Sequence, residues 1–236
     1  MNESPIALVT GGSRGIGLAI VSALATAGWR VHFCSRREQS VEDALSTLPA
    51  SQVSGRAVDV RQQSEVDAFV EHVVAAEGRL DCLVNNAGIG RFAPVDEIRG
   101  DEWRELLEIN LHGAFYFLRA AAPTMRRQGS GWIFNIASLA GRHAFAGGAA
   151  YNASKFGLVA LSEAAMLDLR QDGVRVSAIL PGSVETDFGG AGRKSPGHWR
   201  LEPEDVARTV LDLLRYPDRA LPSRVELRPT RTAPSD

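Results

Sequence analysis

The fold of this chain is decided by the stretch Thr10-Gly11-Gly12-Ser13-Arg14-Gly15-Ile16-Gly17, near the start of its 236 residues. An apolar run, Ile6-Ala7-Leu8-Val9, comes directly before it, and an apolar-periodic stretch that ends at Gly28 follows it. Glycines allow the backbone to turn tightly and to approach a pyrophosphate, and the N-terminus of the following helix offers free N–H groups. The spacing is G-x-x-x-G-x-G, not the common G-x-G-x-x-G. The stretch therefore predicts a strand, a turn and a helix that bind a dinucleotide.

Three other interpretations of the same turn are weaker. Gly12 and Gly17 have P-loop spacing, but Leu18-Ala19 stand where the phosphate-binding Lys-Ser/Thr pair would be needed. The glycines on either side of Ser13 also match the nucleophile elbow of hydrolases, but no later histidine stands in a distinctive context. A purely structural turn is the third alternative. Dinucleotide binding accounts best for the pattern.

Beyond the turn, short apolar runs alternate with longer helical patterns along the whole chain. Such alternation predicts parallel strands joined by right-handed crossovers, with helices on both faces of one sheet. We expect a three-layer α/β fold with a Rossmann-type doubly wound parallel sheet, a single domain over residues 1–236, and a frayed tail over 228–236. The predicted strands are 6–10, 31–35, 55–59, 82–85, 132–137, 174–180 and 225–227, and the predicted helices are 16–27, 41–48, 64–76, 102–125, 150–169 and 203–214.

Composition excludes several classes of function. The chain carries 26 Lys+Arg and 28 Asp+Glu, and this near balance argues against binding nucleic acid or a membrane surface. Its two cysteines, Cys34 and Cys82, lie in predicted strands and are read as core thiols, with no spacing typical of a metal site. No segment approaches the roughly 20 apolar residues that span a bilayer. These features predict a soluble, cytoplasmic protein without a metal.

Three further motifs follow predicted strands. They are Asn85-Asn86-Ala87-Gly88, then Ser138, and then Tyr151-Asn152-Ala153-Ser154-Lys155, whose tyrosine comes thirteen residues after the serine. Together with the glycine-rich turn they resemble the short-chain dehydrogenase/reductase family, and the match continues through Pro181-Gly182. The resemblance implies an oxidoreductase that interconverts a carbonyl compound and a secondary alcohol with a nicotinamide cofactor.

The side chains suggest the same chemistry. Tyr151 and Lys155 share one helix face, and a nearby ammonium favours the phenolate, so we expect the pKa of Tyr151 to fall below its usual value near 10. Ser138 offers a hydroxyl to a substrate oxygen on which charge develops. The resemblance implies that Tyr151 is the general acid/base, that Ser138 orients the substrate, that Lys155 modulates the tyrosine pKa and contacts the ribose, and that Asn110 completes a proton relay. Taken singly, these residues have ordinary structural roles as caps and surface groups.

Arginines at the end of the second strand indicate which nicotinamide cofactor binds. The strand ends in Cys34-Ser35-Arg36-Arg37, without the acidic residue that would accept the ribose 2′-OH of NAD. Arg14 lies in the glycine-rich turn, close to the expected ribose. Guanidinium groups match phosphate geometry, so we predict NADP(H); a solvated arginine cluster is the alternative.

The remaining cofactor contacts rest on the resemblance. It implies that Asp59 and Val60 contact the adenine, that Asn86 to Gly88 lie beside the cofactor, and that Val184 and Thr186 contact the nicotinamide carboxamide. Asn86 and Gly88 also suit an ordinary strand-ending turn. The full predicted set is Gly11, Ser13, Arg14, Gly15, Ile16, Gly17, Ser35, Arg36, Arg37, Asp59, Val60, Asn86, Ala87, Gly88, Tyr151, Lys155, Pro181, Gly182, Val184 and Thr186.

Two segments are expected to contact the substrate. The first follows Ser138 and contains His143 and Phe145; the second runs from Phe188 to Leu201, contains Trp199, and has the glycine content of a lid with hinges. Phe92 is a further candidate for an apolar pocket. The expected substrate is a small-to-medium, partly apolar carbonyl compound or alcohol. The C-terminal segment resembles that of the shorter reductases that act on hydroxy acids and varied carbonyls.

Two long predicted helices carry apolar residues around more than one stripe, which predicts a homodimer or homotetramer formed through helices. A non-catalytic NADP(H)-binding regulator on the same fold is the alternative to an enzyme. The combined presence of Ser138, Tyr151, Lys155 and Asn110 favours the enzyme, because a sensor does not need an activated phenol.

Overall fold

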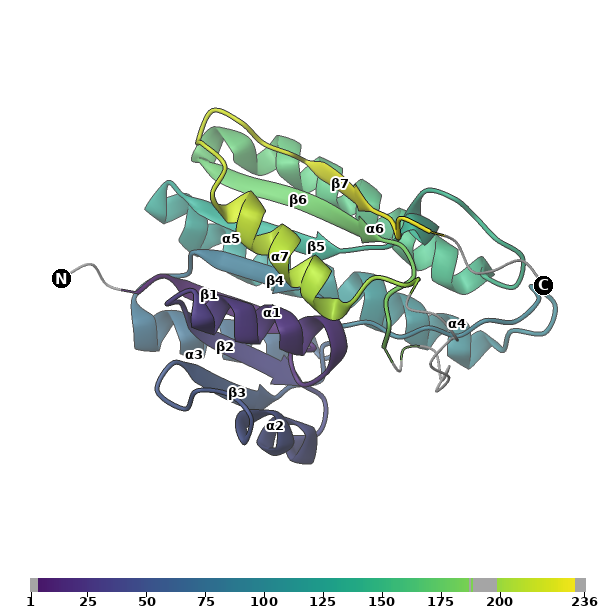
Figure 1. The fold of residues 1–236 in the computed structure, drawn as a ribbon, viewed down its shortest axis with the longest axis horizontal. Coiled ribbons are helices and arrows are strands. Elements are labelled where there is room, and N and C mark those ends of the chain that lie inside the picture. The colour runs from purple at the N-terminus through teal and green to yellow at the C-terminus, as the bar shows by residue number, and fades with distance from the viewer. Residues whose placement is uncertain (1–3, 187, 189–198, 232–236) are drawn as a thin grey trace.

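The computed structural model describes residues 4–186, 188 and 199–231. They contain a seven-stranded parallel sheet with the order β3-β2-β1-β4-β5-β6-β7 (Figure 1). The strands are β1 (Ile6–Thr10), β2 (Arg30–Ser35), β3 (Val53–Ala57), β4 (Cys82–Asn85), β5 (Gly131–Ile136), β6 (Val174–Pro181) and β7 (Arg224–Leu227).

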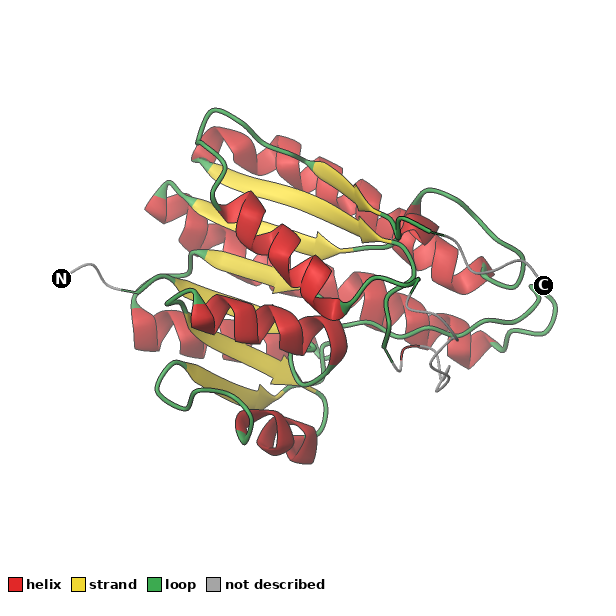
Figure 2. Cartoon of the chain, in the orientation of Figure 1, coloured by secondary structure: helices red, strands yellow, loops and turns green. Residues whose placement is uncertain are grey.

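Helices cover both faces of this sheet and complete three layers (Figure 2). One face packs against α1 (Gly15–Thr26), α2 (Glu38–Leu45) and α7 (Pro203–Leu214). The other packs against α3 (Gln63–Glu77), α5 (Gly113–Gln128) and α6 (Ala149–Leu169), and α4 (Gly100–Leu107) precedes α5. This arrangement confirms the predicted Rossmann-type doubly wound fold.

The strands are apolar runs because both faces of the sheet are buried. Every residue of β1, β4 and β5 is buried, so none of these strands needs an alternating polar face. Helix ends follow their expected signals: Gly78 ends α3 with φ 72°, and Pro203 begins α7 behind a capping box formed by Glu202 and Asp205. Cys34 and Cys82 are free and buried, as predicted.

The predicted helix over 102–125 is wrong as a single element. A five-residue π-helical turn, Glu108–His112, separates α4 from α5, and the N–H of Gly113 donates to the carbonyl of Glu108. Hydrophobic periodicity does not report the extra residue that a π turn inserts. The predicted ranges for β3 and α2 also lie two to three residues too late.

The order of the strands positions the functional site. β1 pairs with β2 on one side and with β4 on the other, so the crossovers leave β1 and β4 in opposite directions. Chains diverge at such a switch point and leave a crevice beyond the carboxyl ends of the strands. In the described part of the chain, no helix is both long enough and apolar enough to span a bilayer.

Candidate active site

A cleft of about 1790 Å³ lies at the carboxyl ends of the strands. Its walls come from the turn after β1, the end of β2, the segments after β3, β4, β5 and β6, and the start of α6. All predicted site residues line it except Gly17 and Asn110. Fold topology alone therefore brings together residues that lie far apart in the sequence.

The glycine-rich turn is held close to the segment after β4. Thr10 Oγ1 accepts hydrogen bonds from the backbone N–H groups of Asn86 (3.0 Å) and Ala87 (2.9 Å), and Asn86 Nδ2 donates to the Thr10 carbonyl at 3.0 Å. A Cβ on Gly11 would lie 2.9 Å from the Ala87 Cα, and Gly11 has a φ of 65°. Asn86 therefore supports the turn structurally, whatever else it contacts.

This turn fits a pyrophosphate. Helix α1 starts directly after Arg14, whose side chain makes no cap hydrogen bond, so the first N–H groups of the helix remain available at the cleft. Gly15 lines the cleft with a φ of 53°, and an added Cβ would meet Thr186 Cγ2 at 3.3 Å. The backbone here presents donors and no obstructing side chain, as an anion requires.

We expect Gly17→Ala to distort this turn, because the new Cβ would lie 2.1 Å from the Gly11 carbonyl oxygen. The clash is with backbone, so the free energy of unfolding should fall by roughly 1–3 kcal/mol and nucleotide affinity should fall with it. Urea unfolding and a fluorescence titration with NADPH measure the two effects. Gly100→Ala is the control, since its nearest neighbour would be 3.8 Å away; an equal loss in both variants would contradict the explanation.

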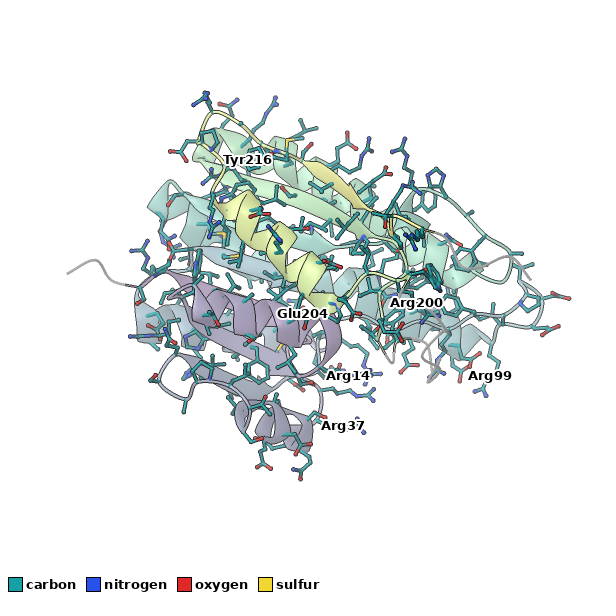
Figure 3. All side chains as sticks on the ribbon, viewed as in Figure 1. Arg14, Arg37, Arg99, Arg200, Glu204 and Tyr216 are labelled. Carbon is teal, nitrogen blue, oxygen red and sulfur yellow. The ribbon has the colours of Figure 1, made fainter. Side chains whose placement is uncertain are left out.

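Arginines gather at one end of the cleft. Arg14, Arg36 and Arg37 are exposed and all line it, and Figure 3 shows Arg14 and Arg37 on the strand-end side of the sheet. Ser13 Oγ donates to Ser35 Oγ at 2.8 Å and joins the turn to the end of β2. Arg36 Nη1 lies 3.9 Å from Glu105 Oε1, a carboxylate that sequence reasoning missed.

Asp59 and Val60 line the cleft beyond β3. Arg61 Nε donates to both carboxylate oxygens of Asp59, at 2.9 and 3.0 Å, and this pairing holds the pKa of Asp59 below its usual value. The side chain is thereby fixed as a carboxylate with its orientation set.

Ser138, Tyr151 and Lys155 meet where β5 ends and α6 begins. Ser138 Oγ accepts a hydrogen bond from the N–H of Ala140 at 3.1 Å, and the side chains of Ser138 and Tyr151 line the same cleft. Lys155 Nζ donates to the carbonyl of Ile136 at 2.9 Å and lies 5.9 Å from the centroid of the Tyr151 ring. A phenol, a second hydroxyl and an ammonium thus share one wall of the cleft.

The expectation that Lys155 lowers the pKa of Tyr151 is wrong for the protein alone. Burial raises the pKa of Tyr151 to about 12, and only the neighbouring Ser138 hydroxyl opposes this rise. Burial also lowers the pKa of Lys155 to about 8. The prediction considered the attraction between phenolate and ammonium but not the desolvation of each charge, which a buried site makes dominant.

Burial of Lys155 has a consequence for stability. Its pKa is lower in the folded than in the unfolded chain, so folding carries a penalty below about pH 8 that disappears as the pH rises toward 10. Relative to Lys155→Met, the wild-type free energy of unfolding should increase by about 2 kcal/mol between pH 7.5 and 10. Urea unfolding of both proteins measures this. Comparing the two proteins cancels the effect of the buried thiols of Cys34 and Cys82, whose raised pKa values lower stability as the pH rises. A difference in free energy of unfolding that does not change with pH would contradict the role of Lys155.

Asn110 lies behind the cleft wall, in the π-helical turn. Its Oδ1 accepts from the N–H of Ile89 at 2.8 Å, and its Nδ2 donates to the Ile89 carbonyl at 3.0 Å and to Ser154 Oγ at 3.0 Å. The buried amide therefore holds the segment after β4 against α6. Its part in a proton relay stays a prediction.

The candidate substrate residues all line the cleft, but their environments differ. His143 is exposed, and Trp199 lies beside Arg200, whose guanidinium carbon is 5.5 Å from its ring centroid. Phe145 and Phe188 belong to an aromatic group around Tyr151. The predicted lid runs from Phe188 to Leu201, and its glycine-containing part, 189–198, lies outside the described residues.

Besides Glu105, sequence reasoning missed three further features of this site. Asn152 is buried and its Nδ2 donates to the carbonyls of Ala140 (2.6 Å) and His143 (3.2 Å), which fixes the loop after Ser138. Arg200 lines the cleft with its Nε buried and without a hydrogen-bond partner among the described residues. Pro229, within the segment expected to fray, lines the cleft and would contact a Cβ on Gly182 at 3.0 Å. Of these features, only the role of Asn152 had a signal in the sequence, namely its position directly after Tyr151.

Comparisons with known proteins agree with this geometry. A family model described as short chain dehydrogenase matches residues 5–196. A putative ketoacyl reductase of Streptomyces coelicolor is 37% identical over 209 residues, 86% of this chain and 80% of its own length. A metagenomic short-chain oxidoreductase solved in complex with NADP is 38% identical, with a TM-score of 0.84 over 97% of this chain and 98% of its own. An alcohol dehydrogenase of Thermococcus sibiricus, complexed with 5-hydroxy-NADP, is 30% identical, with a TM-score of 0.90 over 99% and 100%.

Proposed function

The chain belongs to the short-chain dehydrogenase family, and on this premise we propose that it is an NADP(H)-dependent oxidoreductase acting through Tyr151. It would interconvert a carbonyl compound and a secondary alcohol of small to medium size with partly apolar character. The observation that carries the proposal is the meeting of Ser138, Tyr151 and Lys155 in the same cleft as the glycine-rich turn.

The cofactor site is proposed to extend from the arginine end of the cleft to Tyr151. Arg14, Arg36 and Arg37 would hold the 2′-phosphate, and the backbone from Gly11 to Ile16 would hold the pyrophosphate. Solved relatives contain NADP or its 5-hydroxy derivative, which supports this choice. Bound NADP(H) supplies or accepts the hydride.

In the reduction direction, Tyr151 would act as the acid. A phenol with a pKa raised to about 12 is protonated at neutral pH, so it can donate its proton to the carbonyl oxygen as negative charge develops there. Ser138, which lines the same cleft, would donate to the same oxygen. Lys155 would stabilise the resulting phenolate through its nearby ammonium.

A panel of carbonyl compounds and alcohols, followed by NADPH absorbance, tests the proposal. We expect NADPH consumption with at least one partly apolar ketone and slower turnover with NADH. Tight NADPH binding without turnover of any panel member would instead favour a non-catalytic nucleotide-binding regulator.

We also infer a single domain that forms a homodimer or homotetramer in the cytoplasm. Phe115 of α5 and Phe156 and Leu167 of α6 are 43%, 43% and 52% exposed, which supports burial between subunits. The buried free thiols suit a reducing compartment. Sedimentation equilibrium should show more than one chain per particle at micromolar concentration; a monomer would contradict the assembly.

A further inference from the structure

Four aromatic rings follow one another along the substrate end of the cleft. The ring centroids of Phe145 and Phe92 are 5.8 Å apart, those of Phe92 and Tyr151 are 5.4 Å apart, and those of Tyr151 and Phe188 are 5.8 Å apart. The planes of Phe92 and Tyr151 meet at 76°, an edge-to-face arrangement. All four residues line the cleft, so the ring of the proposed acid sits inside an aromatic wall.

This wall is held by the backbone around it. Phe188 lies where a side chain on Gly90 would be, 2.6 Å from the position of an added Cβ, and Phe145 lies 2.7 Å from the corresponding position on Gly148. The N–H of Ala93 donates to the carbonyl of Gly147 at 2.8 Å, which ties the segment carrying Phe92 to the loop carrying Phe145. The rings are therefore positioned before any substrate arrives.

Phe92 and Phe145 nevertheless leave much of their surface uncovered, with exposed fractions of 50% and 47%. Both side chains line the cleft that contains Tyr151, and the Phe92 ring packs directly against the Tyr151 ring. When an apolar ligand covers apolar surface that is already held in place inside a cleft, the free energy of binding becomes more favourable.

We propose that Phe92 and Phe145 form a subsite for an aryl group attached to the carbonyl carbon of the substrate. This inference rests on the proposed function, because it takes Tyr151 as the group that meets the carbonyl oxygen. An aryl ring should bind here more tightly than an alkyl group of equal size, since tilted and edge-to-face ring pairs are stabilised beyond the contribution of the buried area. The substrate class is then aryl ketones and the matching aryl carbinols.

A pair of ketones with equal carbon skeletons tests the subsite. Acetophenone and cyclohexyl methyl ketone differ in whether the ring is aromatic, and saturating NADP⁺ allows their binding to be measured by calorimetry without hydride transfer. Wild type should bind acetophenone more tightly, and Phe92→Leu and Phe145→Leu should each lower this preference by about twofold to tenfold. Leucine keeps an apolar side chain, so affinity for the cyclohexyl ketone should change little.

Tyr216→Leu is the matched control, because Tyr216 is similarly exposed, at 45%, but lies beyond the end of α7 and outside the residues that line the cleft. An unchanged preference in both cleft variants, an equal loss in the control, or no binding of either ketone would overturn the subsite. Failure of the proposed function looks different: the aryl preference in binding would persist while NADPH reduces neither ketone.

Discussion

Tyr151→Phe is expected to bind NADPH with near wild-type affinity and to lose turnover by about 10²–10⁴-fold. The substitution removes the hydroxyl proposed to pass a proton to the substrate oxygen, and it keeps the ring whose centroid lies 5.4 Å from that of Phe92 and 5.8 Å from that of Phe188. Ser138 alone cannot replace it, because an aliphatic hydroxyl is a much weaker acid than a phenol. Steady-state kinetics with the best ketone of the panel measures the loss, and NADPH fluorescence measures the binding.

Tyr216→Phe is the matched control for this variant. Tyr216 is 45% exposed beyond the end of α7 and lies away from the cleft (Figure 3), so losing its hydroxyl should leave turnover unchanged. Thermal unfolding of both variants checks that neither is misfolded. If Tyr151→Phe turns over ketone at near wild-type rates, Tyr151 is not the general acid/base.

Arg36→Asp is expected to lower the preference for NADPH over NADH by at least a hundredfold in kcat/KM. The substitution would remove the charge-assisted hydrogen bond proposed between Arg36 and the 2′-phosphate, and it would place there a carboxylate that repels this phosphate and accepts from a ribose 2′-OH. Glu105 Oε1 lies 3.9 Å from Arg36 Nη1, so the variant also gathers two carboxylates at this end of the cleft. Most of the change should therefore be a loss of kcat/KM with NADPH.

Arg219→Asp makes the same change of charge at an exposed position between α7 and β7, outside the cleft-lining residues. This variant controls for the effect of net charge on the binding of a polyanionic cofactor. The ratio of kcat/KM with NADPH to kcat/KM with NADH should stay at its wild-type value. Equal efficiency of wild type with NADH and NADPH, or an unchanged ratio in Arg36→Asp, would contradict NADP(H) as the cofactor.

Much of the fold could be predicted because its signals are local. Glycines that need a positive φ mark the turn after β1 and the end of α3, and apolar runs mark strands buried on both faces. The π-helical turn around Asn110 could not be predicted, because one extra residue in a hydrogen-bonded ring leaves the apolar pattern almost unchanged.

The candidate site could also be predicted only in part. Residue types and spacing indicated which side chains belong to the cleft, and the topology of parallel strands explains why they meet. Spacing did not reveal that Asn152 anchors the loop after Ser138, or that Arg200 and Pro229 line the cleft, since those contacts depend on how the folded loops lie against one another.

The amino-acid sequence by itself determined the order of strands and helices, the glycine-rich turn and the identity of the phenol, because each depends on neighbouring residues. Only the tertiary structure decided the protonation of that phenol and the surroundings of its ring. Burial sets the pKa of Tyr151 near 12, and Phe92, Phe145 and Phe188 reach it from three separate segments. Desolvation and packing depend on what the whole chain brings to one place, which spacing along the chain does not specify.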